Sequence, residues 1–105
     1  MQPLYDAIGK TYTRSRQADP GIVKTLSQTL GLLPSGAYLD LACGTGNYTV
    51  ALSGLGGKWS AIDVSTVMLM QAREKDNSVS WIQSSANALP FPDGCFDGAI
   101  CTLAI

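Results

Sequence analysis

The chain has no histidine among its 105 residues and only three cysteines. Without histidine there is no His-based metal site and no Ser-His or Cys-His nucleophile pair, and no metal site of another kind is expected. Cys43, Cys95 and Cys101 form no CxxC pair and are too few for a disulfide framework. We therefore expect reduced thiols in a cytoplasmic protein.

The chain also lacks an excess of charge of either sign and has no long apolar run. The chain carries 7 Lys and Arg against 8 Asp and Glu, which leaves no basic surface for nucleic acid. No apolar run approaches the roughly 18–20 residues that span a bilayer, and the amino end lacks a signal-peptide pattern, so no membrane partner is expected. Because 46% of the residues are apolar, the chain has enough material for one core, and we expect one domain over residues 1–105.

Hydrophobic periodicity predicts strands that alternate with helices. Helices are expected over 20–32, 47–53 and 65–75, and strands over 37–42, 58–63, 79–83 and 96–105. Asp19 and Pro20 have the residue types of an N-cap and a first helical position. The alternation predicts a parallel sheet with right-handed crossovers. The last strand is continuously apolar from Gly98, which favours a fully buried position.

The most informative stretch runs from Tyr38 to Thr49, where a strand-like segment leads through Gly44-Thr45-Gly46 into a helix. Asp63 ends the next strand-like segment. Glycines let the backbone approach a ligand closely, and an acid at the next strand end accepts hydrogen bonds from ribose hydroxyls, so this pair indicates a nucleoside site. Thr49 replaces the third glycine of the dinucleotide pattern, which counts against NAD, although an NAD-binding domain stays an alternative.

Other polar and aromatic residues have structural alternatives. A carboxylate in a strand, such as Asp40, costs free energy unless it is hydrogen-bonded; it either faces a ligand's ammonium group, orders the loop, or is satisfied by loop amides. Asp63 could instead cap the following helix, a role that Ser65 could fill equally well. We expect Trp59 and Trp81, as well as the three cysteines, to be packing residues.

Three motifs, LDLACGTGNYT, IDVSTVMLMQAR and SSANALPFPDGCFDGAI, occur in that order. Together they resemble the class I S-adenosylmethionine-dependent methyltransferases, most closely the small-molecule type 11 group with its ubiquinone/menaquinone-biosynthesis-like enzymes. The resemblance covers essentially the whole chain. It implies a Rossmann-like three-layer α/β sandwich with parallel strands 1–4, in the order 3-2-1-4, of a seven-stranded sheet. It also implies S-adenosylmethionine as cofactor and a small-molecule methyl acceptor.

The resemblance also implies cofactor contacts, position by position. Near the methionine part it places Asp40, Ala42, Gly44, Gly46 and Leu103, with Tyr12 and Arg16 over the carboxylate. Around the nucleoside it places Asp63 on the ribose, Val64 and Met68 on adenine, and Ser85, Ala86 and Asn87 at the adenine edge. Ser85 stands where the family usually has an acid, and a serine accepts a hydrogen bond more weakly. Ala42 stands where glycine is frequent. No catalytic residue is nominated.

The chain supplies only strands 1–4 of that family's sheet. In the order 3-2-1-4 the fourth strand lies at an edge, and it is apolar and uncharged after Asp97. Such an edge is a template for pairing with another chain, so we expect a homo-oligomer formed through it. The alternative to an active enzyme is a truncated, non-catalytic fragment that keeps the fold and at most weak cofactor binding.

Overall fold

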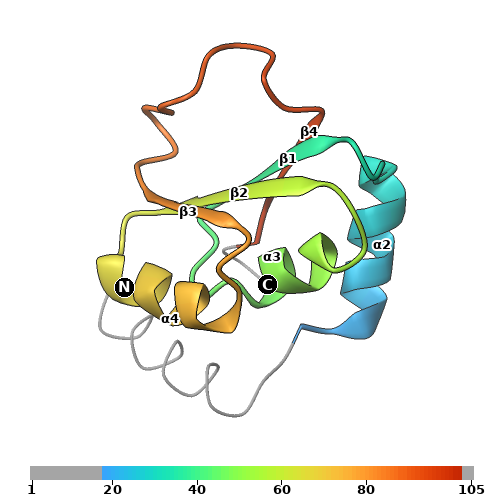
Figure 1. Ribbon diagram of the computed structural model, residues 1–105, viewed down its shortest axis with the longest axis horizontal. Coiled ribbons are helices and arrows are strands. Elements are labelled where there is room, and N and C mark those ends of the chain that lie inside the picture. Colours follow the sequence, from blue (N-terminus) through green and yellow to red (C-terminus); the bar gives the residue numbers. More distant parts are fainter. Residues whose placement is uncertain (1–17, 103–105) are drawn as a thin grey trace.

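The computed structural model describes residues 18–102, which form a four-stranded parallel sheet with helices (Figure 1). In chain order the elements are α2 (Pro20–Leu30), β1 (Ala37–Leu41), α3 (Asn47–Ser53), β2 (Lys58–Asp63), α4 (Thr66–Lys75), β3 (Ser80–Gln83) and β4 (Gly98–Cys101). The strand order is β3-β2-β1-β4, and every pair is parallel. The predicted α/β class and the order 3-2-1-4 are confirmed; the seven-strand total stays a prediction.

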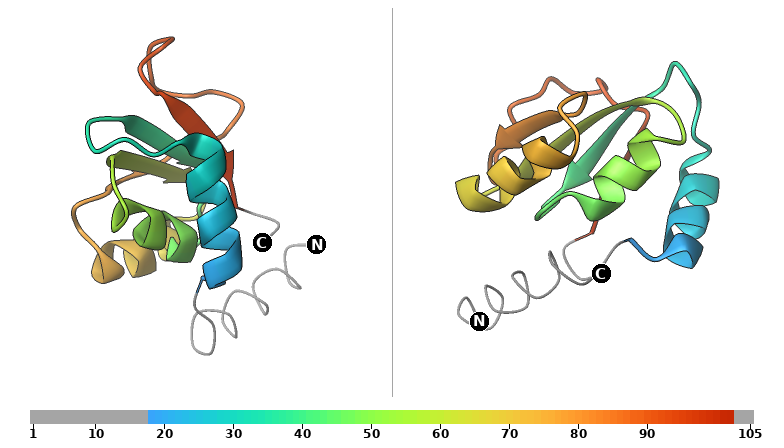
Figure 2. Two further views of the ribbon diagram at one scale, coloured as in Figure 1. Left: turned by 90° about the vertical axis from the view of Figure 1, so that its right-hand side faces the viewer. Right: turned by 60° about the horizontal axis from the view of Figure 1, so that its bottom comes forward.

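The two faces of the sheet are covered by different structures. Figure 1 shows α3 and α4 below the sheet and α2 beside them. Residues 84–97, the arch, join β3 to β4 and pass above the sheet. The two turned views in Figure 2 show the same separation. Right-handed crossovers explain it, because α3 and α4 join strands that follow one direction across the sheet, whereas the β3–β4 segment returns in the other. Within residues 18–102, none of the helices has the length and apolar character needed to span a bilayer.

The main core lies between the sheet and the helices. Alternate strand residues point to this side, among them Tyr38 of β1, Trp59 and Ala61 of β2, and Trp81 of β3. The rings of Tyr38 and Trp59 lie 5.4 Å apart, and residues of α2 pack against the same cluster. Leu39 and Ile62, which alternate with these residues, are also buried but lie outside the cluster, on the arch side. The tryptophans are core residues, as predicted.

The helix ends follow the predicted residue types closely. Asp19 caps α2, its Oδ1 accepting hydrogen bonds from the amides of Gly21 at 2.8 Å and Ile22 at 3.2 Å. Gly31, at φ 61°, ends this helix, so it stops at Leu30 rather than at residue 32. Ser65 caps α4 by accepting from the Met68 amide. The cap residues therefore decided both starts, and one left-handed glycine decided the stop.

The prediction for the fourth strand was wrong in length and in burial. β4 extends only from Gly98 to Cys101, and Ala99 and Cys101 are exposed. The continuous apolar run indicated two covered faces, but within the described residues no helix crosses the arch side of β4. The cysteine prediction holds for Cys43, which is buried, and is wrong for Cys95 and Cys101, which are exposed.

Candidate functional site

The candidate site is the edge of the sheet at which the parallel strands end. Cys43, just after β1, donates its amide to the carbonyl of Ile62 at 2.9 Å. Ser84, just after β3, donates its amide to the carbonyl of Asp63 at 3.1 Å. The chain after β1, β2 and β3 is thus joined at one edge, which is where α/β proteins of this topology bind ligands.

Asp63 holds the glycine turn against the end of β2. Its Oδ2 accepts the Gly44 amide at 2.8 Å, and its Oδ1 accepts the Ser65 amide at 2.9 Å. The helix cap itself is Ser65, so capping does not account for Asp63. Each carboxylate oxygen has a second lone-pair site, so a ligand hydroxyl can still donate to Asp63, although the residue is only 6% exposed.

The glycine turn is a short reversal that ends in α3. The Gly46 amide donates to the carbonyl of Cys43 at 3.0 Å, and both glycines have positive φ, 60° at Gly44 and 80° at Gly46. A Cβ on Gly46 would lie 2.6 Å from the Trp81 ring. Both the close packing of Trp81 and the positive φ therefore favour glycine at position 46. Ala42, where the family often has glycine, also has a positive φ of 58°.

Lys75 reaches the same turn from the end of α4. Its Nζ donates to the carbonyl of Thr45 at 2.9 Å and to Oδ1 of Asn47 at 2.6 Å. Partial burial lowers the pKa of Lys75 below its ordinary value. This lysine was not among the predicted site residues, because a cation in the last turn of a helix is explained well enough by the helix dipole.

Asp40 is fully buried and joins three elements. Its Oδ2 accepts the hydroxyl of Thr49 in α3 at 2.7 Å, and both of its oxygens accept the hydroxyl of Thr102, just after β4, at 3.0 and 3.1 Å. Burial raises the pKa of Asp40 to about 6, although the hydrogen bonds from Thr49 and Thr102 act in the opposite direction. This geometry orders the strand ends and satisfies the acid with hydroxyl groups; its predicted contact with the cofactor is not tested.

The two threonines were missed as site residues, although the sequence held a signal for one of them. A buried acid needs donors, and Thr49 replaces a glycine on the helix that faces Asp40. Thr102 is separated from Asp40 by 62 residues, so only the pairing of β1 with β4 brings them together. Asp97, just before β4, has a structural role, because its Oδ2 accepts the Ala37 amide at 2.9 Å.

The residues predicted around adenine lie just after β2, on α4 or on the arch. Val64 is 68% exposed, and Met68 is half-buried on α4. Ser85 is half-buried, and its Oγ accepts the Asn87 amide at 3.1 Å, a local turn bond, while Ala86 and Asn87 are exposed. Gln83, the last residue of β3, donates its side-chain amide to the carbonyl of Val64, just after β2. The predicted contacts of Tyr12, Arg16 and Leu103 lie outside the described residues.

Comparison with known proteins agrees with this geometry. A family model described as a methyltransferase domain matches residues 39–105. The demethylmenaquinone methyltransferase of Lactococcus lactis is 33% identical over 111 residues, which cover 92% of this chain and 44% of that protein. The ubiquinone/menaquinone biosynthesis C-methyltransferase UbiE of Pectobacterium carotovorum is 45% identical over 69 residues, 56% of this chain and 27% of that protein. The chain thus spans less than half the length of these relatives.

Solved structures show the same likeness. The crystal structure of an Anabaena variabilis protein, described as a methyltransferase from an antibiotic biosynthesis pathway, superposes with a TM-score of 0.76 at 35% identity. The match covers 85% of this chain and 35% of that one. The YcgJ protein of Bacillus subtilis superposes with a TM-score of 0.69 at 25% identity, over 75% of this chain and 36% of that one. The strand order, the glycine turn and these matches agree, and the chain belongs to the methyltransferase domain family.

Proposed function

We propose that the chain binds S-adenosylmethionine at the carboxyl edge of the sheet, for transfer of its methyl group to a small-molecule acceptor. The pairing of the Gly44 amide with the Asp63 carboxylate, at 2.8 Å, carries the proposal. This contact brings the glycine turn and Asp63 side by side at the ends of neighbouring strands, which supports a site where the turn would approach the cofactor and Asp63 would hold its ribose. The site fits the cofactor, because Asp63 keeps lone pairs for hydroxyl groups and the two glycines leave the backbone of the turn without side chains where a ligand would approach.

The residues of the chain would bind and orient rather than react. When bound, the cofactor supplies an electrophilic methyl group on a sulfonium, so positioning of the acceptor can provide much of the acceleration. Asp63 would hold the ribose hydroxyls, and the turn from Gly44 to Gly46 would hold the amino-acid part. Val64 offers an exposed apolar side chain beside Asp63, on which adenine would pack. No described residue is assigned as a general base.

The class of acceptor rests on the names of the relatives. The Lactococcus lactis and Pectobacterium carotovorum relatives are named for methylation in menaquinone and ubiquinone formation. A small apolar molecule with a nucleophilic carbon or oxygen is therefore the acceptor class we propose. Location in the cytoplasm stays a prediction from the reduced cysteines.

Calorimetric titration with S-adenosylhomocysteine tests the cofactor site. Asp63→Ala should weaken binding by about a hundredfold, because hydrogen bonds from the ribose to a charged acceptor are lost. Asp97→Ala is the matched control, since Asp97 also accepts a backbone amide but lies beside Ala37, where β1 begins; its affinity should match that of the wild-type chain. Absence of heat from the wild-type chain at millimolar ligand would remove the cofactor claim. Binding without turnover on any acceptor would favour the non-catalytic alternative.

A further inference from the structure

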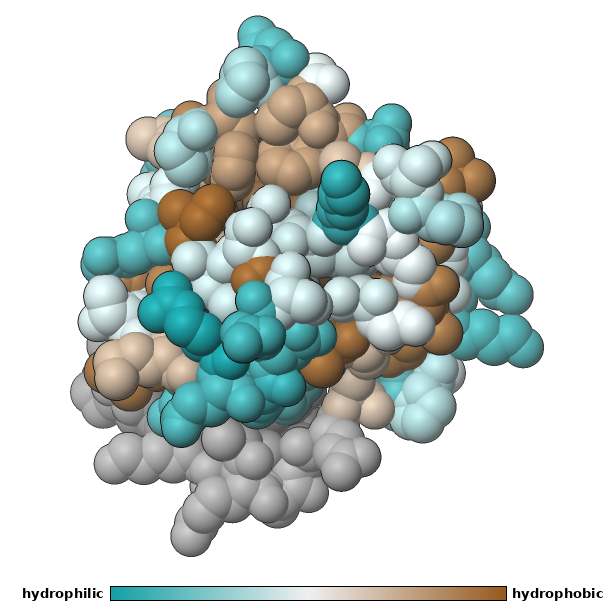
Figure 3. Space-filling model, viewed as in Figure 1, coloured by the Kyte–Doolittle hydropathy of each residue, from teal (hydrophilic) through white to brown (hydrophobic). Residues whose placement is uncertain are grey.

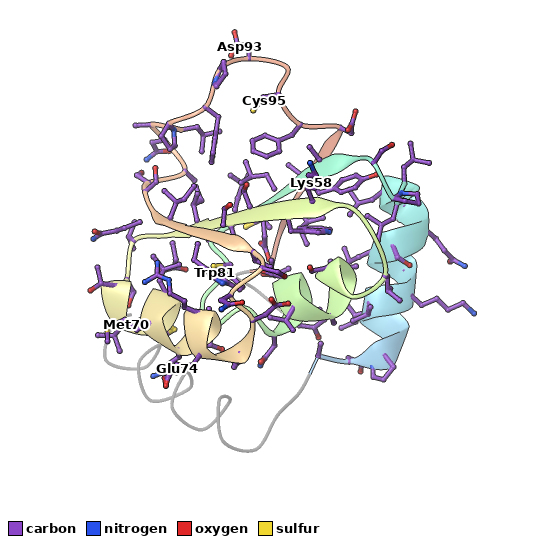
Figure 4. All side chains as sticks on the ribbon, viewed as in Figure 1. Lys58, Met70, Glu74, Trp81, Asp93 and Cys95 are labelled. Atoms are coloured by element: carbon purple, nitrogen blue, oxygen red, sulfur yellow. The ribbon has the colours of Figure 1, made fainter. Side chains whose placement is uncertain are left out.

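The glycine turn, Gly44–Gly46, is held in place by side chains that lie much later in the chain. Asp63 accepts a hydrogen bond from the Gly44 amide, and Lys75 donates one to the Thr45 carbonyl. The Trp81 ring lies against Gly46. Figure 4 shows Trp81 below the sheet, on the same side as the helices. Each residue of the turn thus has its own support, and of these supports only Lys75 acts on a carbonyl group.

The carbonyl contact decides how one peptide plane is turned. In a trans peptide the carbonyl and the following N–H point in opposite directions, so fixing the Thr45 carbonyl also fixes the Gly46 amide. That amide closes the turn on Cys43. If this peptide rotated, the Thr45 carbonyl oxygen would take the place of the Gly46 N–H and face the Cys43 carbonyl, so the turn would open. Lys75 therefore helps to keep the turn closed by holding the Thr45 carbonyl.

The Asn47 side chain shows how strongly the lysine directs its neighbours. An ammonium group has only donors, so Asn47 must present Oδ1 to it. Its Nδ2 is then buried without a hydrogen-bond partner among the described residues, which costs free energy. The opposite amide orientation would turn Nδ2 toward the ammonium group. The amide orientation is therefore set by Lys75.

We propose that Lys75 is a positioning residue for the cofactor turn: through Thr45 and Asn47 it holds the Gly44–Gly46 backbone in the orientation that binds the amino-acid part of the ligand. The inference rests on the proposed cofactor function and adds a residue of α4 to it. Lys75 acts through the turn and not by touching the ligand. Its removal should therefore affect recognition of the amino-acid part, and leave recognition of the nucleoside part, which depends on Asp63, intact.

Two ligands separate these parts. S-Adenosylhomocysteine carries the amino-acid group, and 5′-methylthioadenosine has the same nucleoside and sulfur without it. Lys75→Met should bind S-adenosylhomocysteine about tenfold more weakly, because without the two Lys75 hydrogen bonds the turn would hold its binding orientation only about a tenth of the time. Its affinity for methylthioadenosine should stay within about twofold of the wild-type value. Lys75→Arg should recover most of the loss, since a guanidinium also donates to two acceptors.

The matched control is Lys58→Met, which makes the same change on β2. Figure 4 places Lys58 near the α2 side of the sheet, away from Glu74, the neighbour of Lys75 on α4. Lys58→Met should bind both ligands like the wild-type chain. Unchanged binding of S-adenosylhomocysteine by Lys75→Met, or an equal loss for both ligands, would overturn the inference. If the wild-type chain binds neither ligand, the proposed function fails instead, and the inference fails with it.

A second variant keeps the test open if Lys75→Met does not fold. Asn47→Ala removes one of the two acceptors and leaves Lys75 on the Thr45 carbonyl. It should weaken the binding of S-adenosylhomocysteine by about threefold and leave that of methylthioadenosine unchanged, because one of the two Lys75 contacts is kept. Full affinity of a folded Asn47→Ala for S-adenosylhomocysteine would count against the positioning role. Thermal melting of each variant verifies that it is folded.

Discussion

The helix-covered face of the sheet and the arch-covered face differ in how far burial extends. On the helix side, one continuous core joins α2, α3, α4 and all four strands, and Trp81 extends it to the glycine turn. On the arch side, Leu39 and Ile62 are buried, but Ala99 and Cys101 of β4 are exposed. Figure 3 shows apolar surface near the top of the molecule, where Figure 1 places the arch.

This difference explains why the candidate site is held from one side. The glycine turn is packed against α4 and β3 by Trp81 and Lys75, both on the helix side. The arch would supply the predicted adenine contacts from an irregular segment, where the hydrogen bonds of Ser85 join it to its near neighbours Ser84, Asn87 and Ala88. The Phe91 and Phe96 rings of this segment meet edge-to-face at 4.9 Å. We therefore expect the cofactor turn to be rigid and the adenine side to be more adaptable.

The largest effect is expected when alanine replaces glycine at two positions with similar backbone angles, one on each side of the sheet. Gly46 has φ 80° and Gly94, on the arch, has φ 74°. A Cβ would meet Trp81 at 2.6 Å in the first case and nothing within 4 Å in the second. Gly46→Ala should cost about 3 kcal/mol or more, from backbone strain and overpacking together, and Gly94→Ala about 1 kcal/mol. Urea unfolding measures both; equal losses would contradict the packing argument.

The second test concerns the open edge of β4. In the described part of the chain β4 pairs only with β1, and its sequence GAIC carries no charge. We expect the full chain to sediment as a dimer or larger assembly at micromolar concentration, through this edge. Ala99→Lys should give a monomer, because lysine blocks edge pairing, whereas Ser80→Lys on β3, the opposite edge, should not. A wild-type monomer at that concentration would contradict assembly.

The third test titrates the acid that joins the helix side to the end of β4. The pKa of Asp40 rises from 3.8 to about 6 in the folded chain, so the folded state binds the proton more tightly than the unfolded state. This group therefore lowers stability as pH rises through that interval, and its contribution is most favourable below it.

Asp40→Asn should remove this dependence and keep an acceptor for the threonine hydroxyls. The stability difference between variant and wild-type chain should change by on the order of 2 kcal/mol between acid and neutral pH, in favour of the variant at neutral pH. Urea unfolding at several pH values measures it, with Asp97→Asn as the control acid. A pH-independent difference would show that Asp40 has an ordinary pKa.

The smallest expected effect is at Ala42, directly after β1. Its φ of 58° is a left-handed angle that strains an alanine. Ala42→Gly should stabilise the chain by about 0.5 kcal/mol, the relief of strain minus the extra chain entropy of glycine. Ala51→Gly, in the middle of α3, is the same change at an ordinary helical position and should destabilise by about 1 kcal/mol. Thermal unfolding compares the two; a loss at Ala42 would contradict the strain argument.

Local patterns were enough to predict most elements. The caps of α2 and α4, at Asp19 and Ser65, were predicted because their side chains bond amides two or three residues away. β2 and α3 match their predicted ranges. β4 was predicted too long because an apolar run shows only that a strand can be buried. Whether both of its faces are covered depends on elements elsewhere in the chain.

By itself, the sequence determined the order of elements, the family and the pair of Gly44 and Asp63, since each rests on neighbouring residues or on the regular joining of parallel strands. Only the tertiary structure decided what holds that pair in place. Thr102 reaches Asp40 across 62 residues, and Lys75 reaches Thr45 across 30. Such contacts are made where one element packs on another, and the spacing of residues along a chain does not contain the distances between packed surfaces.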